Sequence, residues 1–136
     1  MKLLVDINVL LDVLLDREPH AAASSAVWSA IERSVAEGLV AAHAVTTIYY
    51  LIRREQNEAN TKRTVGAVMS VFGVAPVDQS VIREALAMPM GDFEDAVTAA
   101  AARRAGCDLI VTRDPKGFRG STVRALAPEA VVALLG

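Results

Sequence analysis

The sequence has little of several features that mark other classes of protein. Its single cysteine, Cys107, can form no disulfide within the chain, which fits a reducing cytoplasm. Aromatic residues make up only 4% of the chain. The formal net charge of −2 argues against a surface coated with positive charge for non-specific nucleic-acid binding.

Long apolar segments are also lacking. The longest weakly polar run, residues 39–52, is shorter than the roughly 18 apolar residues that a membrane span needs. The start of the chain is interrupted by acids, at Asp6, Asp12 and Asp16, and so lacks the pattern of a signal peptide. We therefore expect a cytoplasmic protein without membrane contact.

What the sequence does contain is a hydrophobic fraction of 53%, carried mainly by alanine, valine and leucine. A chain of 136 residues is long enough to bury a core of its own, so we expect residues 1–136 to form one domain. Small aliphatic side chains suit helices that pack closely on a sheet.

Strand-like and helix-like stretches alternate along the chain. Apolar runs predict strands at residues 2–5, 39–43, 74–77, 108–112 and 123–126. Helical spacing of apolar residues predicts helices over residues 9–14, 20–37, 46–56, 61–72, 79–87, 93–105 and 128–135. This alternation indicates an α/β fold, a three-layer α/β/α sandwich around a central, mostly parallel sheet.

Several residues predict where these elements begin and end. Asn8 stands at the N-cap position of the first helix, and Gly38 is expected to end the second. Asp78 and Asp92 are expected to cap the helices that follow them. Pro76 indicates that its strand lies at an edge of the sheet.

Acidic residues gather at one end of the expected architecture. Asp6 follows the first strand, Asp114 follows the strand over 108–112, and Asp92 and Asp95 open the helix that leads into that strand. Such a helix starts near the carboxyl end of the strand after it, where ligands bind in open α/β sheets. Asp6 joins the group if the two strands are neighbours. The alternative is that each acid serves only locally, as a helix cap, a first-turn acid or a turn residue.

A cluster of carboxylates predicts a bound cation. Acids within a few ångströms of one another repel, and each is driven toward protonation unless the charge is neutralised. Mg²⁺ or Mn²⁺ bound by a few carboxylates keeps waters and leaves room for a phosphate. Such an ion can supply a hydroxide nucleophile and stabilise the charge that develops on a phosphodiester. The expected chemistry is the hydrolysis of nucleic acid.

Three stretches carry a resemblance to a known family: Val-Asp-Ile-Asn-Val-Leu-Leu-Asp at residues 5–12, Phe-Glu-Asp-Ala-Val at residues 93–97, and residues 109–118. Together they resemble the PIN domain family, and especially its small bacterial single-domain members, which include VapC-type toxins of toxin–antitoxin pairs. The resemblance implies a Mg²⁺- or Mn²⁺-dependent endoribonuclease acting on RNA, frequent homodimers and, in the toxins, an antitoxin partner.

The resemblance also implies roles by position. Asp6 corresponds to the first metal ligand, Asp95 to the acid of the alanine-rich helix, and Asp114 to the acid after the strand. Asn8 corresponds to a polar neighbour that orients ligands or water.

One position departs from the family pattern. Tyr50 stands where the family often has a glutamate, and a neutral phenol is a poor ligand for Mg²⁺. The site therefore has one carboxylate fewer unless Glu94 or Asp92 supplies it. Two outcomes stay open: an active nuclease with a rearranged site, or a weakened module that mainly binds nucleic acid.

Five residues are expected to contact the substrate, namely Asn8, Tyr50, Arg54, Arg113 and Lys116. Tyr50 and Arg54 lie on one helix face, where they could stack on a base and hold a phosphate, although Tyr50 could also be a half-buried packing residue. Arg113 and Lys116 flank Asp114 and are expected to contact phosphates, which gives affinity without sequence choice.

A phosphatase of the haloacid-dehalogenase type is a competing hypothesis, because it too places an acid after the first strand. Asp6 would be its nucleophile, but Asn8 cannot donate a proton as its general acid. No apolar strand leads into residues 91–92, and the chain is short for that fold. Metal-dependent cleavage of RNA that is lost in Asp6→Asn would separate a nuclease from a binding module, and phosphorylation of Asp6 would indicate the phosphatase.

Overall fold

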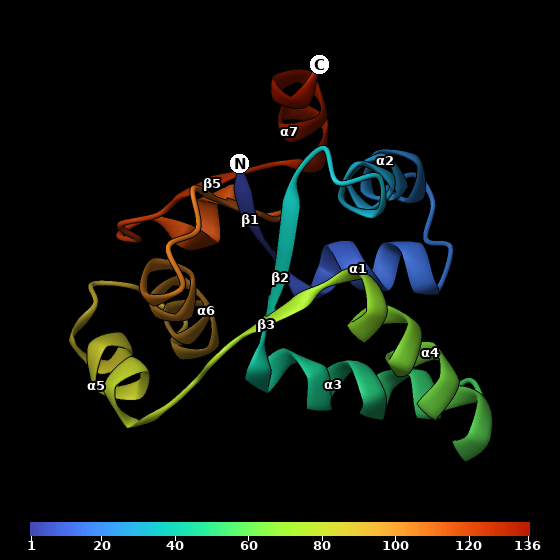
Figure 1. The fold of residues 1–136 in the computed structure, drawn as a ribbon. Coiled ribbons are helices and arrows are strands. Elements are labelled where there is room, and N and C mark those ends of the chain that lie inside the picture. The colour runs from blue at the N-terminus through green and yellow to red at the C-terminus, as the bar shows by residue number, and fades with distance from the viewer.

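A five-stranded parallel sheet forms the centre of the computed structural model, which describes residues 1–136 (Figure 1). The strands are β1 (Lys2–Val5), β2 (Glu37–Ala41), β3 (Gly73–Ala75), β4 (Leu109–Val111) and β5 (Arg124–Leu126). Their order in the sheet is β3-β2-β1-β4-β5 and every pairing is parallel, as the alternation of strands and helices predicts.

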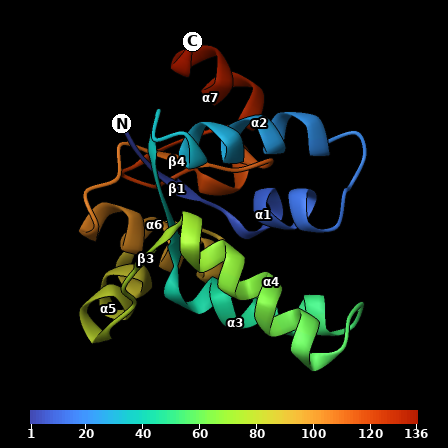
Figure 2. The ribbon, with the colours of Figure 1, turned by 45° about the vertical axis from the view of Figure 1, so that its right-hand side comes forward.

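Helices cover both faces of this sheet. They are α1 (Ile7–Leu14), α2 (Ala21–Glu32), α3 (Ala42–Arg53), α4 (Glu58–Val71), α5 (Gln79–Ala87), α6 (Phe93–Arg104), α7 (Pro128–Leu135) and the short 3₁₀ helix η1 (Pro115–Phe118). Figure 2 shows α3 lying along α4, and α2 lying between α1 and α7. None of these helices is both long and apolar enough to traverse a lipid bilayer.

Two hydrophobic clusters, one on each face, hold the layers together. Leu3 and Val5 of β1 point into the cluster formed with α1, α2, α3, α4 and α7, while Leu4 points into the cluster formed with α5 and α6. The inner side of α6 is a run of fully buried alanines, Ala99–Ala102, so this helix lies very close to the sheet. The three-layer prediction is confirmed.

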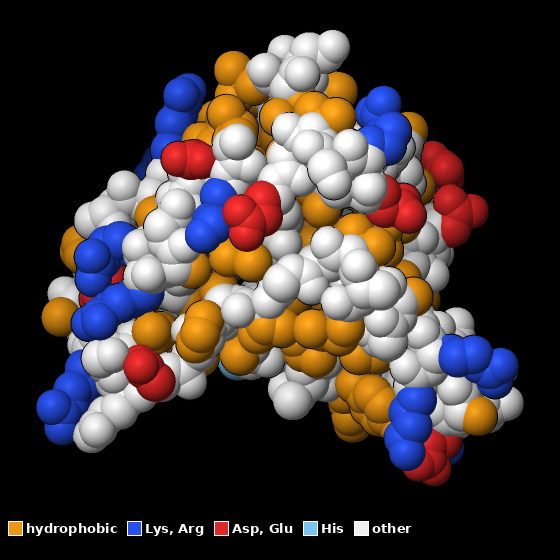
Figure 3. Space-filling view, viewed as in Figure 1, with side chains coloured by type: hydrophobic (Ala, Val, Ile, Leu, Met, Phe, Trp, Pro, Cys, Tyr) orange, Lys and Arg blue, Asp and Glu red, His pale blue; other side chains and the backbone are white.

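Positively charged side chains occur over much of the surface seen in Figure 3, and they gather most clearly in two regions of it. In the space-filling view, Lys and Arg side chains gather over α5 and α6 at one side and over the free end of the α3–α4 pair at the other, with apolar side chains between them (Figure 3). The exposed cations of these regions include Arg83, Arg103 and Arg104 in the first, and Arg53, Lys62 and Arg63 in the second.

Some predicted boundaries are confirmed and others are wrong. The helices over 79–87 and 128–135 have the predicted bounds. The strand predicted over 74–77 is an edge strand as expected, but β3 ends at Ala75 and Pro76 lies beyond it. Asp78 accepts a hydrogen bond from the Val81 amide at 3.0 Å and so caps α5. Asn8 is not an N-cap, because Asp6 itself has the extended backbone of a cap and α1 begins at Ile7.

The second helix ends earlier than predicted. It stops at Glu32, and Ser34 then turns the chain with a positive φ of 59°. Gly38 does not end this helix but lies inside β2, where a side chain would meet Ile31 and Phe72. Since β2 ends at Ala41, α3 also begins at Ala42 rather than at residue 46.

The packing around Gly38 leads to a stability prediction. A Cβ at this position would lie 2.6 Å from Cδ1 of Ile31 and 2.9 Å from Cδ1 of Phe72, so Gly38→Ala overpacks the core. We expect it to lower the free energy of unfolding by about 1–3 kcal/mol in urea denaturation. The matched control is Gly66→Ala in α4, where a Cβ meets no atom within 4 Å, and it should instead stabilise by about 0.5–1 kcal/mol. Equal effects of the two substitutions would contradict this account.

Candidate functional site

The two strands that end in acids are neighbours in the sheet. Leu4 of β1 is in register with Ile110 of β4, so the residues that follow these strands emerge at the same edge. Asp6 follows β1, and Asp114 follows β4 after Thr112 and Arg113. The condition under which Asp6 joins the other acids is therefore met.

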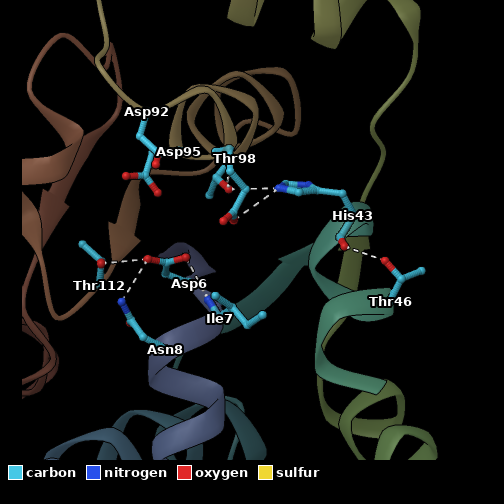
Figure 4. A network of polar contacts seen from close by, with 10 residues as sticks. Asp6, Ile7, Asn8, His43, Thr46, Asp92, Asp95, Thr98 and Thr112 are labelled. Carbon is cyan, nitrogen blue, oxygen red and sulfur yellow. Dashed lines mark hydrogen bonds and ion pairs between the residues drawn. The ribbon is translucent and has the colours of Figure 1, made fainter. Parts of the chain in front are cut away.

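Asp6 is fixed by three hydrogen bonds (Figure 4). One carboxylate oxygen accepts from the Ile7 amide at 2.8 Å, and the other accepts from the Thr112 hydroxyl at 2.8 Å and from the Asn8 side-chain amide at 3.3 Å. The residue is 7% exposed, and this burial raises the pKa of its carboxyl although the hydrogen bonds from Thr112 and Ile7 oppose the rise. Asp6 therefore caps α1, as the alternative interpretation expects, and also lies within the electrostatic reach of Asp114.

Among the acids at this edge of the sheet, Asp95 has the pKa that departs most from its ordinary value. It lies half-buried in the first turn of α6, and its pKa is raised to about 7. Burial is the largest cause, and the negative charges of four other acids, Asp92, Asp6, Glu94 and Asp114, add to it. The acids that the sequence singled out are thus close enough to act on one another.

The carboxylates of Asp114 and Asp95 both lie close to Gly117, a residue without a side chain. A Cβ on Gly117 in η1 would lie 2.9 Å from Oδ2 of Asp114 and 3.1 Å from Oδ2 of Asp95. Glycine at this position therefore leaves the two carboxylates the space that they occupy. The Asp114 amide donates to the Thr112 hydroxyl at 3.1 Å, and that hydroxyl donates to Asp6, so one threonine links the acids of both strands.

Asp92 and Glu94 lie at the outer rim of this cluster. Asp92 is exposed and caps α6 by accepting a hydrogen bond from the Asp95 amide at 2.9 Å, as predicted. Glu94 is exposed and lies 3.6 Å from Nε2 of His43. The charges of both exposed acids contribute to the raised pKa of Asp95.

His43 and two threonines belong to this site although the sequence analysis did not select them. The imidazole lies in the first turn of α3 and points toward α6, with Nε2 3.4 Å from the Thr98 hydroxyl and 3.6 Å from the Glu94 carboxylate (Figure 4). The predicted strand over 39–43 hid this residue, because a helix that starts at Ala42 aims it at the acids. Thr112 carries a sequence signal that was available, namely its position two residues before Asp114.

The predicted substrate contacts lie in different environments. Asn8 bridges the two loops: its side-chain amide donates to Asp6, and its carbonyl oxygen accepts from the Arg113 amide at 3.3 Å. Lys116 is exposed in η1. The Arg113 side chain, in contrast, is turned to Asp12, with Nε 2.8 Å from Oδ2 of that buried carboxylate.

Tyr50 is exposed on α3 rather than half-buried. It is 62% exposed, and the guanidinium of Arg54 lies 5.0 Å from the centre of its ring. Tyr50 follows His43 by seven residues, so the two positions lie about 10 Å apart along the axis of α3. No residue of α3 is an acid, and this helix therefore contributes no carboxylate to the cluster.

The residues present fit a hydrated dication rather than an enclosed metal cage. No three His, Cys, Asp or Glu side chains converge closely enough to surround an ion on their own. Mg²⁺ usually binds through one or two carboxylates and keeps several waters. An open group of acids whose charges all raise the pKa of Asp95 has the chemistry of such a site.

Comparison with known proteins gives a consistent result. Residues 2–116 match the family model described as PIN domain. The chain is 23% identical over 133 residues to ribonuclease VapC1 of Aquifex aeolicus, covering 94% of this chain and 91% of that protein.

Solved structures share the fold. VapBC2 from Rickettsia felis, bound to a DNA fragment from its promoter, superposes with a TM-score of 0.71 at 9% identity, over 93% of this chain and 98% of that chain. VapC20 of Mycobacterium tuberculosis, a toxin that cleaves the sarcin–ricin loop, superposes with a TM-score of 0.63 at 14% identity. The superposition covers 79% of this chain and 86% of that chain. PAE2754 from Pyrobaculum aerophilum superposes with a TM-score of 0.61 at 22% identity, over 99% of this chain and 95% of that chain.

The raised pKa of Asp95 predicts a pH dependence of stability. In the unfolded chain this carboxyl titrates near pH 4, whereas in the folded protein it titrates at about 7. The folded state therefore binds the proton more tightly, so this stabilisation is complete below about pH 4 and is lost as the pH rises through 7. In EDTA, the free energy of unfolding of the wild type should fall between pH 5 and pH 8 relative to that of Asp95→Asn, as measured by urea denaturation.

The control for this comparison is Glu129→Gln, which changes an exposed acid in α7 and should leave the wild-type pH dependence intact. Parallel curves for the wild type and Asp95→Asn would contradict the raised pKa.

Proposed function

Since this chain belongs to the PIN domain family, we propose that it is a metal-dependent ribonuclease of the VapC type, which hydrolyses phosphodiester bonds of RNA at Asp6, Asp95 and Asp114. The observation that supports this most strongly is that acids from three distant segments lie close enough to contribute to the pKa of Asp95, which is raised to about 7. A structural role gives no reason to place these repelling charges together, whereas a cation-binding role does.

The residues that would hold Mg²⁺ or Mn²⁺ are Asp6, Asp95 and Asp114, and Asp92 or Glu94 would add charge from the rim. When bound, such an ion lowers the pKa of its water and stabilises the charge on the phosphate. Asp6 is held by hydrogen bonds from Thr112, Asn8 and Ile7, which leave it little freedom to turn away. The protein thereby orients this carboxylate before any ligand arrives.

RNA would be held by residues around the acids. Lys116 follows Asp114 by two residues and is exposed, so its ammonium can contact a phosphate. Tyr50 and Arg54 lie on the face of α3 that begins with His43, and an exposed aromatic ring offers a platform for an unpaired base. Such a surface suits single-stranded RNA, whose bases are free to stack.

The proposed partners follow from the family. The Rickettsia felis relative is part of a VapBC assembly, and we propose an antitoxin protein and a second copy of this chain as partners here. The proposed location is the cytoplasm, where the single buried cysteine needs no disulfide partner.

A catalytically weakened binding module is the second candidate, because α3 supplies no acid to the cluster. The phosphatase alternative finds no support in the geometry. It needs a proton donor at residue 8, and the Asn8 amide instead donates a hydrogen bond to the Asp6 carboxylate.

Substitution of Asp6 tests the nuclease directly. Asp6→Asn keeps the shape of the side chain but removes its charge, and we expect Mn²⁺-dependent cleavage of a single-stranded RNA to fall by about 100-fold or more. The control is Asp16→Asn, an exposed residue with a positive φ that asparagine accepts, which should cleave like the wild type. A wild type that binds RNA without cleaving it in Mn²⁺ would instead favour the binding module.

The space beside Gly117 provides a test of metal binding. Gly117→Ala would displace the carboxylates of Asp114 and Asp95, and we expect it to weaken Mn²⁺ binding by about 10-fold in calorimetry while the protein stays folded. Gly91→Ala is the control, because a Cβ at that position meets no atom within 4 Å although it lies next to Asp92. Unchanged Mn²⁺ affinity in Gly117→Ala would argue against a site between these two acids.

A further inference from the structure

We propose that Arg113 is a positioning residue, which holds Asp114 at the acidic cluster through a buried ion pair with Asp12, and that it is not a contact to RNA. This inference deepens the proposed function and rests on it. It concerns two residues that lie far apart in the sequence and meet beneath the acids.

Asp12 needs a cation because of where it lies. Its side chain is 0% exposed inside α1, between the sheet and α2. Oδ2 accepts a hydrogen bond from the Ser24 hydroxyl at 3.1 Å. It also lies 2.8 Å from Nε of Arg113, in an ion pair without hydrogen-bond geometry, whereas Oδ1 has no hydrogen-bond partner. A buried carboxylate without a positive partner is strongly disfavoured, so Arg113 is held at this position by the charge of Asp12.

Arg113 lies between Thr112 and Asp114, in the segment that connects β4 with the acidic cluster. The Thr112 hydroxyl donates to Asp6, the Arg113 amide donates to the Asn8 side chain, and the Asp114 amide donates to Thr112. The contacts of residues 112–114 thus tie the end of β4 to the start of α1. Of the contacts that residues 112–114 make with α1, only the ion pair between Arg113 and Asp12 involves a residue beyond the first turn of the helix.

The side chains of Arg113 and Asp114 lead in opposite directions. That of Arg113 reaches Asp12, while that of Asp114 lies against Gly117 beside Asp95. The strand–helix unit of residues 2–14 therefore carries both Asp6 and Asp12, and the loop after β4 carries a partner for each. Pulling Arg113 away from Asp12 would rotate this loop and move Asp114 with it.

The same geometry explains why Arg113 is a poor contact for phosphate. Its side chain is 29% exposed, and its charge is balanced by a carboxylate at 2.8 Å. Swinging the guanidinium toward RNA would leave Asp12 buried and unpaired. Lys116, which is exposed in η1, is free of that constraint.

The test compares three variants with the wild type: Arg113→Met, the double variant Asp12→Leu with Arg113→Met, and Lys116→Met as the control for a phosphate contact. Three quantities are measured for each, namely Mn²⁺ affinity by calorimetry, kcat and KM for cleavage of a single-stranded RNA, and the salt dependence of RNA binding in Ca²⁺. The double variant replaces the ion pair with apolar side chains, so it folds without a buried charge even if Arg113→Met does not.

If Arg113 positions Asp114, Arg113→Met should lose about 10-fold in Mn²⁺ affinity and in kcat, with KM and the salt slope unchanged. The double variant should recover to within about threefold of the wild type, since apolar packing can replace the pair. Lys116→Met should instead raise KM and lower the salt slope by about one.

Two results would overturn the inference. One is a salt slope that falls by about one in both Arg113 variants, as expected for a lost phosphate contact. The other is a double variant that folds but regains no Mn²⁺ affinity. A wild type that cleaves no RNA would refute the proposed function instead, and the salt slopes and the recovery of Mn²⁺ affinity would still decide the role of Arg113.

Discussion

The parallel pairing of β1 with β4 is the constraint on which the site depends. Because these strands are neighbours in register, Asp6 and Asp114 leave the sheet at the same edge, and one hydroxyl, that of Thr112, reaches both loops. The helix before β4 must return along the sheet, which brings Asp95 to the same edge. Any sheet order that separated β1 from β4 would scatter the acids.

This arrangement has an electrostatic cost that the rest of the fold offsets. The neighbouring acids add to the raised pKa of Asp95, and Asp114 adds to that of Asp6, so the unliganded protein keeps these charges together against their repulsion. Hydrogen bonds to Asp6 and the close packing of α6 on the sheet oppose that repulsion. Sites that store unfavourable charge in this way are typically those that bind a ligand of the opposite sign.

Much of the fold is readable from the sequence because it rests on local periodicity. The strand over residues 2–5 and the helix over 79–87 follow from apolar spacing and caps, and the acids follow from their places after strands. The prediction for Gly38 is wrong because the sequence does not distinguish a glycine that avoids a steric clash within a strand from one that ends a helix.

The pairing of Asp12 with Arg113 was missed for a different reason. These residues meet only through the tertiary fold, which no local pattern reveals. His43 was hidden by an error of a few residues in a strand boundary, enough to change the direction in which a side chain points.

The alanines of α6 constrain how such a protein can diverge. The helix that carries Asp95 rests on the sheet through Ala99–Ala102, which have no exposed surface, so a larger side chain there would lift Asp95 away from its partners. Substitutions near Asp95 are therefore accommodated more readily at the exposed and half-buried positions of residues 88–92 than on this inner face of α6.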